Sequence, residues 1–290
     1  MATVRIGDPA VQRALVRVLE TPQFEVIPLR NVHDQMAFLP PAATVSVTAS
    51  PTKPIEATVD LSIEFEARGF RAVPHLSARM IRDRGHLTEL LMRLDDAGID
   101  RAFVVGGDGD APGHFPDGLS LLRAMAELKH GLTEIGIPCY PQGHPTIPDD
   151  RLLEALMAKA PFARSMTTQM CFDARAIERW LAARRADGIA LPAIIGVPGV
   201  TDPQRLVRIG ARIGVRDTRR FVLKNARFVA RMFRSGGFYR PDGLLRELGP
   251  LFADPAADIR GIHLYTFNSI EPTAAWQRDL LTRLAGPITA

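Results

Sequence analysis

Short apolar segments rich in β-branched residues recur along the chain, and most are followed by a segment with helical spacing of its apolar residues. The strand-like segments lie at 24–29, 43–48, 71–76, 101–106, 136–140, 164–169, 193–197 and 260–266. The clearest helical patterns cover 87–97, 118–135, 149–159 and 173–187. Continuous apolar strands that alternate with amphipathic helices predict a parallel sheet with helices packed on its outside.

Eight such units in 290 residues match the strand count and the size of a (β/α)8 TIM barrel. We therefore expect one barrel domain, 1–290, with an extra N-terminal helix at 8–19 that plugs the bottom of the barrel. The long interval 202–259 leaves room for additional helices between strands seven and eight. A doubly wound open sheet is the alternative, but its first turn should carry a glycine fingerprint, and FEVIPLR at 24–30 carries none.

The composition excludes several classes of protein. Two cysteines cannot build a disulfide framework, and the charged N-terminal sequence has no signal-peptide core. No stretch is apolar for long enough to span a membrane, so we expect a cytoplasmic protein with no membrane partner. The net charge is +4, but acids are interleaved with the arginines, so we expect no nucleic-acid partner either. The oligomeric state is not predicted.

Polar side chains collect where the predicted strands end, which is the catalytic end of this fold. They are Glu25, Thr48, His75, Asp108, Asp110, Tyr140, Gln142, His144, Gln169, His263, Tyr265, Thr266 and Asn268. Burying an unpaired carboxylate is costly, so Glu25 is either paired with a structural arginine or functional. Side chains from distant segments converge on one mouth, and this convergence predicts a site there.

Metal and phosphate sites are the alternatives at this mouth. His75, Asp108, His144 and His263 could surround a cation, but barrel metal hydrolases usually take two histidines from one strand, and no H-x-H occurs. We therefore expect no metal. The glycine-rich stretch VVGGDGDAPG at 104–113 does not follow G-x-G-x-x-G, and its aspartates would repel a pyrophosphate. It is not expected to cradle a phosphate.

Seven short motifs occur in the order in which one enzyme family carries them. They are FEVIPLR (24–30), VSVT (45–48), PHLS (74–77), GGD (106–108), YPQGHP (140–145), TQMCFD (168–173) and HLYTFN (263–268). In these motifs the chain resembles the methylenetetrahydrofolate reductases. Each motif is weak alone, but seven in the right order across most of the chain are specific.

The resemblance implies an enzyme that reduces 5,10-methylenetetrahydrofolate to 5-methyltetrahydrofolate with electrons from NADH or NADPH. Burial favours the protonated form of a carboxyl group, and Glu25 is the expected general acid that opens the five-membered ring. An ionised Asp108 would stabilise the developing cation, although counting from the other side of strand four assigns that role to Asp110. Gln169 would hydrogen-bond the pterin. The expected substrate- or cofactor-binding residues are Thr48, His75, Gly107, Asp110, Tyr140, His144, His263, Tyr265 and Asn268.

The departures from the family concern its usual cofactor, FAD. Gly106 stands where the family has arginine, and Gln142 where it has an acid. The helix after strand five, DDRLLEALMAK, offers acids where the family contacts the flavin diphosphate. Fewer cationic contacts and added acids disfavour a diphosphate. FAD is therefore possible but doubted, and we expect the nicotinamide to pass its hydride directly to the folate.

Two functions of other classes stay open from the residues alone. A barrel hydrolase or lyase with an acid/base pair, with or without a metal, would show no nicotinamide dependence. A non-catalytic folate-binding protein would bind folate without turnover.

Overall fold

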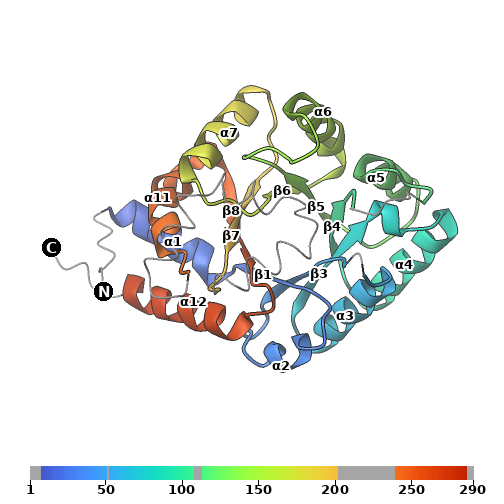
Figure 1. Cartoon of the computed structure of the whole chain (residues 1–290), viewed down its shortest axis with the longest axis horizontal. Helices are drawn as coiled ribbons and strands as arrows, with labels where there is room; N and C mark the ends of the chain where they lie inside the picture. The colour runs from blue at the N-terminus through green and yellow to red at the C-terminus, as the bar shows by residue number, and fades with distance from the viewer. Residues whose placement is uncertain (1–7, 51, 108–112, 202–238, 286–290) are drawn as a thin grey trace.

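The computed structural model describes residues 8–50, 52–107, 113–201 and 239–285. Its centre is a closed barrel of parallel strands in the order β1 to β8, with the helices outside it (Figure 1). The strands are β1 (Gln23–Val26), β2 (Thr44–Val47), β3 (Arg71–Ser77), β4 (Arg101–Val105), β5 (Glu134–Cys139), β6 (Ser165–Thr168), β7 (Ala193–Pro198) and β8 (Ile259–Tyr265). The predicted (β/α)8 barrel is confirmed, and each strand lies within a few residues of its expected range.

The helices of the described residues surround this barrel (Figure 1). They are α1 (Pro9–Glu20), α2 (Val32–Met36), α3 (Glu56–Ala67), α4 (Arg84–Asp96), α5 (Gly118–Ala126), α6 (Asp149–Lys159), α7 (Ala174–Ala186), α11 (Asp242–Ala253) and α12 (Ile270–Ala285), with short 3₁₀ turns at Ala78–Met80, Ala160–Phe162 and Pro255–Ala257. Between β7 and β8 the described part contains α11. The rest of the interval predicted to hold helices, 202–238, lies outside the described residues. No helix that the structure describes has the length and the hydropathy to cross a membrane.

The helix predicted at 118–135 is too long, because α5 ends at Ala126. Its last two predicted residues, Glu134 and Ile135, belong instead to β5 and pair with β4. Gly131 lies between the end of α5 and the start of β5, and an added β-carbon there would stand 2.2 Å from Asp95 Oδ1. The chain must leave the helix to pass this close to α4 and then to enter the sheet, and the apolar spacing alone does not reveal that need.

The N-terminal helix α1 is present but is placed differently from the expected plug. It begins at Pro9 after Asp8, whose carboxylate accepts a hydrogen bond from the Ala10 amide at 2.8 Å. Its apolar face packs against α11, α12 and β8. Arg17 donates to the Ile259 and Phe252 carbonyls, both at 3.1 Å. The helix therefore covers the start of β8 within the outer layer.

Two environments lie on the two faces of the barrel strands. Side chains that point outward, such as Phe24, Val45 and Leu76, are 0% exposed and belong to the hydrophobic core between sheet and helices. The residues between them in sequence point inward, and several are polar: Glu25, Ser46, His75, Ser77 and His263 are all buried. The interior layers of such barrels are usually filled by branched apolar side chains. A polar interior is therefore the feature that needs a chemical explanation.

Candidate active site

Glu25 lies inside the barrel next to a histidine of the neighbouring strand. Its carboxylate Oε2 is 3.3 Å from His263 Nε2, and the Glu25 side chain is only 11% exposed. His263 Nδ1 lies 3.2 Å from Gln23 Oε1. The strand register explains the contacts, since Gln23 and Glu25 on β1 pair with His263 and Tyr265 on β8. Among the described residues, no arginine or lysine forms an ion pair with Glu25.

His75, on β3, forms a second polar group of the interior together with residues of β2 and its end. Its Nε2 lies 2.7 Å from Ser46 Oγ and its Nδ1 lies 3.0 Å from Thr48 Oγ1. The Phe103 ring lies against it, with centroids 4.8 Å apart. Desolvation by burial, and then the positive charge that His263 can carry, lower the pKa of His75 to about 3. His75 is therefore a neutral imidazole at any physiological pH, with one hydroxyl partner donating and the other accepting.

Tyr265 joins β8 to the end of β6, and Thr168 in turn joins β6 to β7. Its hydroxyl donates to the Thr168 carbonyl at 3.1 Å, and the Thr168 hydroxyl accepts from the Gly196 amide at 2.8 Å. The Tyr265 ring stands edge-on to His263, with centroids 4.7 Å apart. Burial, with the nearby Glu25 carboxylate as the next cause, raises the pKa of Tyr265 well above its usual value. Tyr265 stays neutral and can act as a fixed wall of the site.

Asn268 and Thr266 bind main-chain atoms of the first strand's end. Asn268 Oδ1 accepts from the Ile27 amide at 2.8 Å, and its Nδ2 donates to the Ile27 carbonyl at 2.9 Å and to Asn31 Oδ1 at 3.2 Å. The Thr266 hydroxyl donates to the Glu25 carbonyl. These side chains join the end of β8 to the end of β1. In the structure Asn268 holds the segment that carries Glu25, while its predicted contact with a ligand stays a prediction.

The residues predicted after β5 and β6 form a more open group. Tyr140 and His144 are half-buried, with ring centroids 5.3 Å apart in an edge-to-face arrangement. His144 Nδ1 also accepts from the Thr146 amide at 3.3 Å. Gln169 follows β6 directly, its amide donates to the Cys139 carbonyl at 2.8 Å, and its side chain is exposed. The side-chain amide of Gln169 is therefore exposed at this end of the barrel, where a ligand can reach it.

Around strand four the structure describes only part of the predicted site. Gly107 has a φ of +86°, and a β-carbon there would lie 2.0 Å from Ser77 Oγ, so both conformation and space require glycine. Asp108 and Asp110 lie outside the described residues. Their predicted roles, and the choice between them, therefore stay predictions.

Four residues of the interior were not predicted as site residues: Gln23, Ser46, Phe103 and Thr168. Gln23 and Ser46 contact His263 and His75 respectively. Both stand two positions before a predicted site residue on the same strand, so the alternation of side chains along a strand could have identified them. Phe103 and Thr168 have no comparable signal, because an apolar residue in a strand and a threonine at its end are common.

The resemblance found in the sequence places flavin contacts at the start of α6, and the charges there do not fit a diphosphate. Asp149 and Asp150 occupy the first turn, and no side chain caps the helix. The guanidinium of Arg151 is held by Glu154 at 2.8 Å on the exposed surface. A diphosphate here would meet three carboxylates and an arginine that is already paired, and this arrangement disfavours anion binding.

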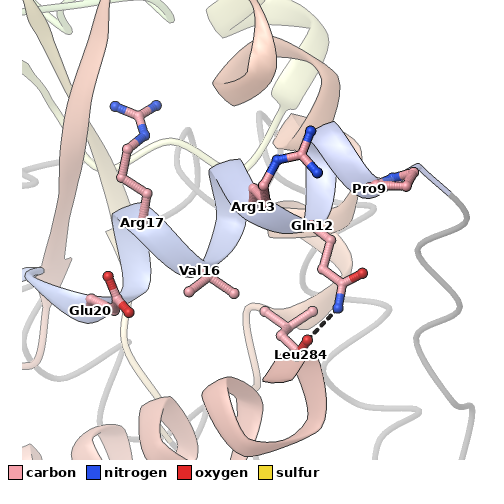
Figure 2. Close-up of a pocket in the computed structure, with 7 residues that line it drawn as sticks. All are labelled: Pro9, Gln12, Arg13, Val16, Arg17, Glu20 and Leu284. Atoms are coloured by element: carbon pink, nitrogen blue, oxygen red, sulfur yellow. Dashed lines mark hydrogen bonds between the residues drawn. The ribbon is translucent and has the colours of Figure 1, made fainter. Parts of the chain in front are cut away.

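Two further features of the described residues bear on the site. In the described ranges no group of three or more histidine, cysteine, aspartate or glutamate side chains is arranged to hold a metal ion. A surface hollow of about 370 Å³ lies on α1 and is lined by Pro9, Gln12, Arg13, Val16, Arg17, Glu20 and Leu284 (Figure 2). Arg17 there donates to the Ile259 carbonyl at the start of β8, and Gln12 donates to the Leu284 carbonyl. None of the residues that line this hollow belongs to the polar interior.

Comparison with protein families decides the relationship of the chain. The family model described as methylenetetrahydrofolate reductase matches residues 28–216, which is more than half of the 290 residues. The chain belongs to the methylenetetrahydrofolate reductase family. The match includes Thr48, His75, Gly107, Tyr140, His144 and Gln169. Glu25, His263, Tyr265 and Asn268 lie beyond its ends, so for them the geometry above is the evidence.

Comparison with solved structures found matches of low similarity. A phosphonopyruvate hydrolase in complex with oxalate and Mg²⁺ is 7% identical with a TM-score of 0.48, over 94% of this chain and 86% of that one. A protein assigned as a phosphonomutase from Burkholderia cenocepacia J2315 is 12% identical with a TM-score of 0.48, over 94% and 98%. A protein from Aquifex aeolicus VF5 is 11% identical with a TM-score of 0.45, over 95% and 99%. At these values the likenesses carry no argument about reductase chemistry.

Proposed function

We propose that this member of the methylenetetrahydrofolate reductase family reduces 5,10-methylenetetrahydrofolate to 5-methyltetrahydrofolate, with NADH or NADPH as the hydride donor. One observation supports the proposal most: the carboxyl group of Glu25 is buried in the barrel beside a histidine, with no arginine or lysine paired to it among the described residues. A buried carboxyl group without a cationic partner is suited to carry a proton. The proposed reaction consumes one proton in each turnover.

Glu25 is proposed to deliver that proton to N10 of the folate. The O–H bond of the carboxyl group breaks, an N10–H bond forms, and the bond between N10 and the methylene carbon breaks. The ring opens and leaves a cationic iminium at N5. The Glu25 carboxylate then faces this cation and stabilises it until hydride arrives, and solvent returns a proton to Glu25 afterwards.

The other polar residues are proposed to orient the folate and to stabilise its charge. The exposed amide of Gln169 is suited to hydrogen-bond the pterin, and Tyr140 and His144 offer aromatic faces nearby. Asp108 is assigned to the developing cation by its position in the family motif, with Asp110 as the alternative. Neutral His75 adds no positive charge that would oppose the iminium.

We further propose that the hydride passes from C4 of the nicotinamide to the methylene carbon without a flavin. The nicotinamide is oxidised as the iminium carbon becomes the methyl group, so the electrons balance without another carrier. The support is the set of carboxylates at the start of α6, together with the pairing of Arg151 to Glu154. The diphosphate of a flavin would therefore find few favourable charge contacts at the start of α6.

Anaerobic mixing of the pure protein with methylenetetrahydrofolate and NADH or NADPH, with no flavin added, tests the reaction. We expect nicotinamide oxidation and 5-methyltetrahydrofolate in equal amounts. Folate binding with no product under either nucleotide would instead indicate a binding protein. Turnover of the folate that does not depend on NADH or NADPH, and that stops when a chelator removes metal ions, would indicate the metal-dependent alternative.

The fate of deuterium tests direct transfer. With the nicotinamide deuterated at the transferred position of C4 and ordinary water as solvent, we expect deuterium in the product methyl group. A flavin intermediate would lose much of that label, because a reduced flavin exchanges its transferable hydrogen with water. Stoichiometric flavin absorbance in the purified protein would contradict direct transfer while leaving the overall reaction intact.

A further inference from the structure

His263 forms a hydrogen-bonded contact with the Glu25 carboxylate, and the proposed mechanism has so far given it no task. It is almost fully enclosed, with its side chain 3% exposed. An enclosed histidine that bridges two side chains must place its hydrogens according to what those side chains accept or donate.

The Gln23 contact decides which ring nitrogen carries the hydrogen. Gln23 Oε1, 3.2 Å from His263 Nδ1, is an amide oxygen and can only accept. With the Gln23 amide oriented in this way, Nδ1 donates. A neutral His263 then has a lone pair at Nε2, and this is the atom that lies 3.3 Å from Glu25 Oε2.

One proton must lie between Nε2 and Oε2 for this contact to be favourable. It can reside on Glu25, which then donates to the imidazole, or on His263 as an ion pair. The charge-separated form is disfavoured because both side chains are desolvated. Removing the proton altogether would set a lone pair against a carboxylate. The geometry therefore favours retention of one proton by the pair, with Glu25 as its holder.

The neighbouring groups leave this arrangement undisturbed. Tyr265 on β8 is neutral, because burial raises the pKa of its phenol well above the usual value. His75 on β3 is neutral as well, with its pKa lowered to about 3. On β7 the residue in register with His263 is Gly196, and on β2 the residue in register with Glu25 is Ser46. Neither of these can take up or release a proton.

We propose that His263 is a positioning residue which, held as the Nδ1–H form by Gln23, keeps Glu25 loaded with the proton that the reaction consumes. This deepens the proposed function and rests on it for its catalytic meaning. The hydrogen placement itself is a property of the folded chain and does not depend on turnover. No intermediate on the histidine is required, since Glu25 alone passes the proton to the folate.

The first experiment reads the tautomer directly. Full-length protein with nitrogen-labelled histidine contains seven imidazoles, and the signal of His263 is identified by its loss in His263→Asn. We expect the hydrogen of neutral His263 on Nδ1, with Nε2 unprotonated. A hydrogen on Nε2 with a bare Nδ1 would overturn the inference, whatever the protein catalyses. Gln23→Leu removes the acceptor, and we expect it to shift the hydrogen toward Nε2.

The second experiment reads the catalytic consequence as a pH profile of kcat/KM. Without the histidine, Glu25 loses its acceptor, so His263→Asn should move the alkaline limb about one pH unit or more toward lower pH. Below that limb, the loss of activity should be smaller than the loss above it, because the missing acceptor matters most where protons are scarce. A uniform loss at all pH values would mean a merely structural role and would contradict the inference.

A matched control is His86, another buried histidine, which lies in α4 outside the barrel interior. His86→Asn should leave the position of the alkaline limb unchanged. Failure of the proposed function and failure of the inference about His263 can be told apart. Absence of turnover in wild type would contradict the proposed function, whereas the tautomer measurement decides which nitrogen of His263 carries the hydrogen in either case.

Discussion

Asn268 binds both main-chain groups of Ile27, accepting from its amide at 2.8 Å and donating to its carbonyl at 2.9 Å. The two residues are far apart in sequence, one after β8 and the other after β1. The bonds join the segment after β8 to the segment after β1, two residues beyond Glu25. Asn268 also has a φ of +56°, a left-handed conformation that asparagine tolerates better than most residues.

Asn268→Ala should destabilise the fold by about 2–3 kcal/mol, because two buried backbone groups of Ile27 lose their partner. Asn31→Ala is the matched control, since it removes only one side-chain bond to the same asparagine, and should cost less than about 1 kcal/mol. Urea unfolding of both variants measures the difference. Equal losses would indicate that the bonds to Ile27 contribute little.

Two inward glycines on neighbouring strands should respond in opposite ways to the same substitution. A β-carbon at Gly196 would lie 2.4 Å from the Thr168 carbonyl oxygen and 2.8 Å from the Tyr265 ring, whereas one at Gly261 would meet nothing within 4 Å. Gly196→Ala should cost more than about 2 kcal/mol through overpacking. Gly261→Ala should be neutral or stabilising by up to about 1 kcal/mol. Thermal unfolding of the pair checks this, and a stable Gly196→Ala would show that β6 and Tyr265 can shift easily.

His75 should make stability depend on pH. Its pKa is about 3 in the folded chain, against 6.5 for an ordinary histidine, so between these values the unfolded state binds more protons. The contribution is fully present above pH 6.5 and is lost as pH falls toward 3. Wild type should therefore lose about 2 kcal/mol more than His75→Asn between about pH 7.5 and pH 5. Chemical unfolding at both pH values provides the comparison, and parallel losses would mean that His75 is protonated in the folded state.

The barrel could be predicted from the sequence because its strands are buried on the outward face and carry a continuous apolar signal. The order of the motifs then assigned most of the candidate residues to one end of the barrel, because the motifs fall where strands end and all eight parallel strands end on the same side. The end of α5 could not be predicted in the same way. The residues after Ala126 keep a helical spacing, and only the pairing of Glu134 with Arg101 shows that the chain must return to the sheet.

The partners of the predicted residues were harder to foresee than the residues themselves. Nothing in the sequence indicates that His263 contacts Glu25, because that contact depends on the register between β1 and β8. Asn268 illustrates the same limit: its motif suggests a ligand contact, while its side chain in the fold holds Ile27. Sequence patterns assign residues to an end of the barrel, but the hydrogen bonds within it follow from strand register.

The role of Glu25 is the central claim, and the turnover of Glu25→Gln tests it most directly. The amide keeps the shape and can still hydrogen-bond, but it cannot give up a proton. We predict that turnover of methylenetetrahydrofolate with the nicotinamide falls by at least about 100-fold, while folate affinity stays within about threefold of wild type. A fall in turnover of less than about threefold would contradict the assignment of Glu25 as the general acid.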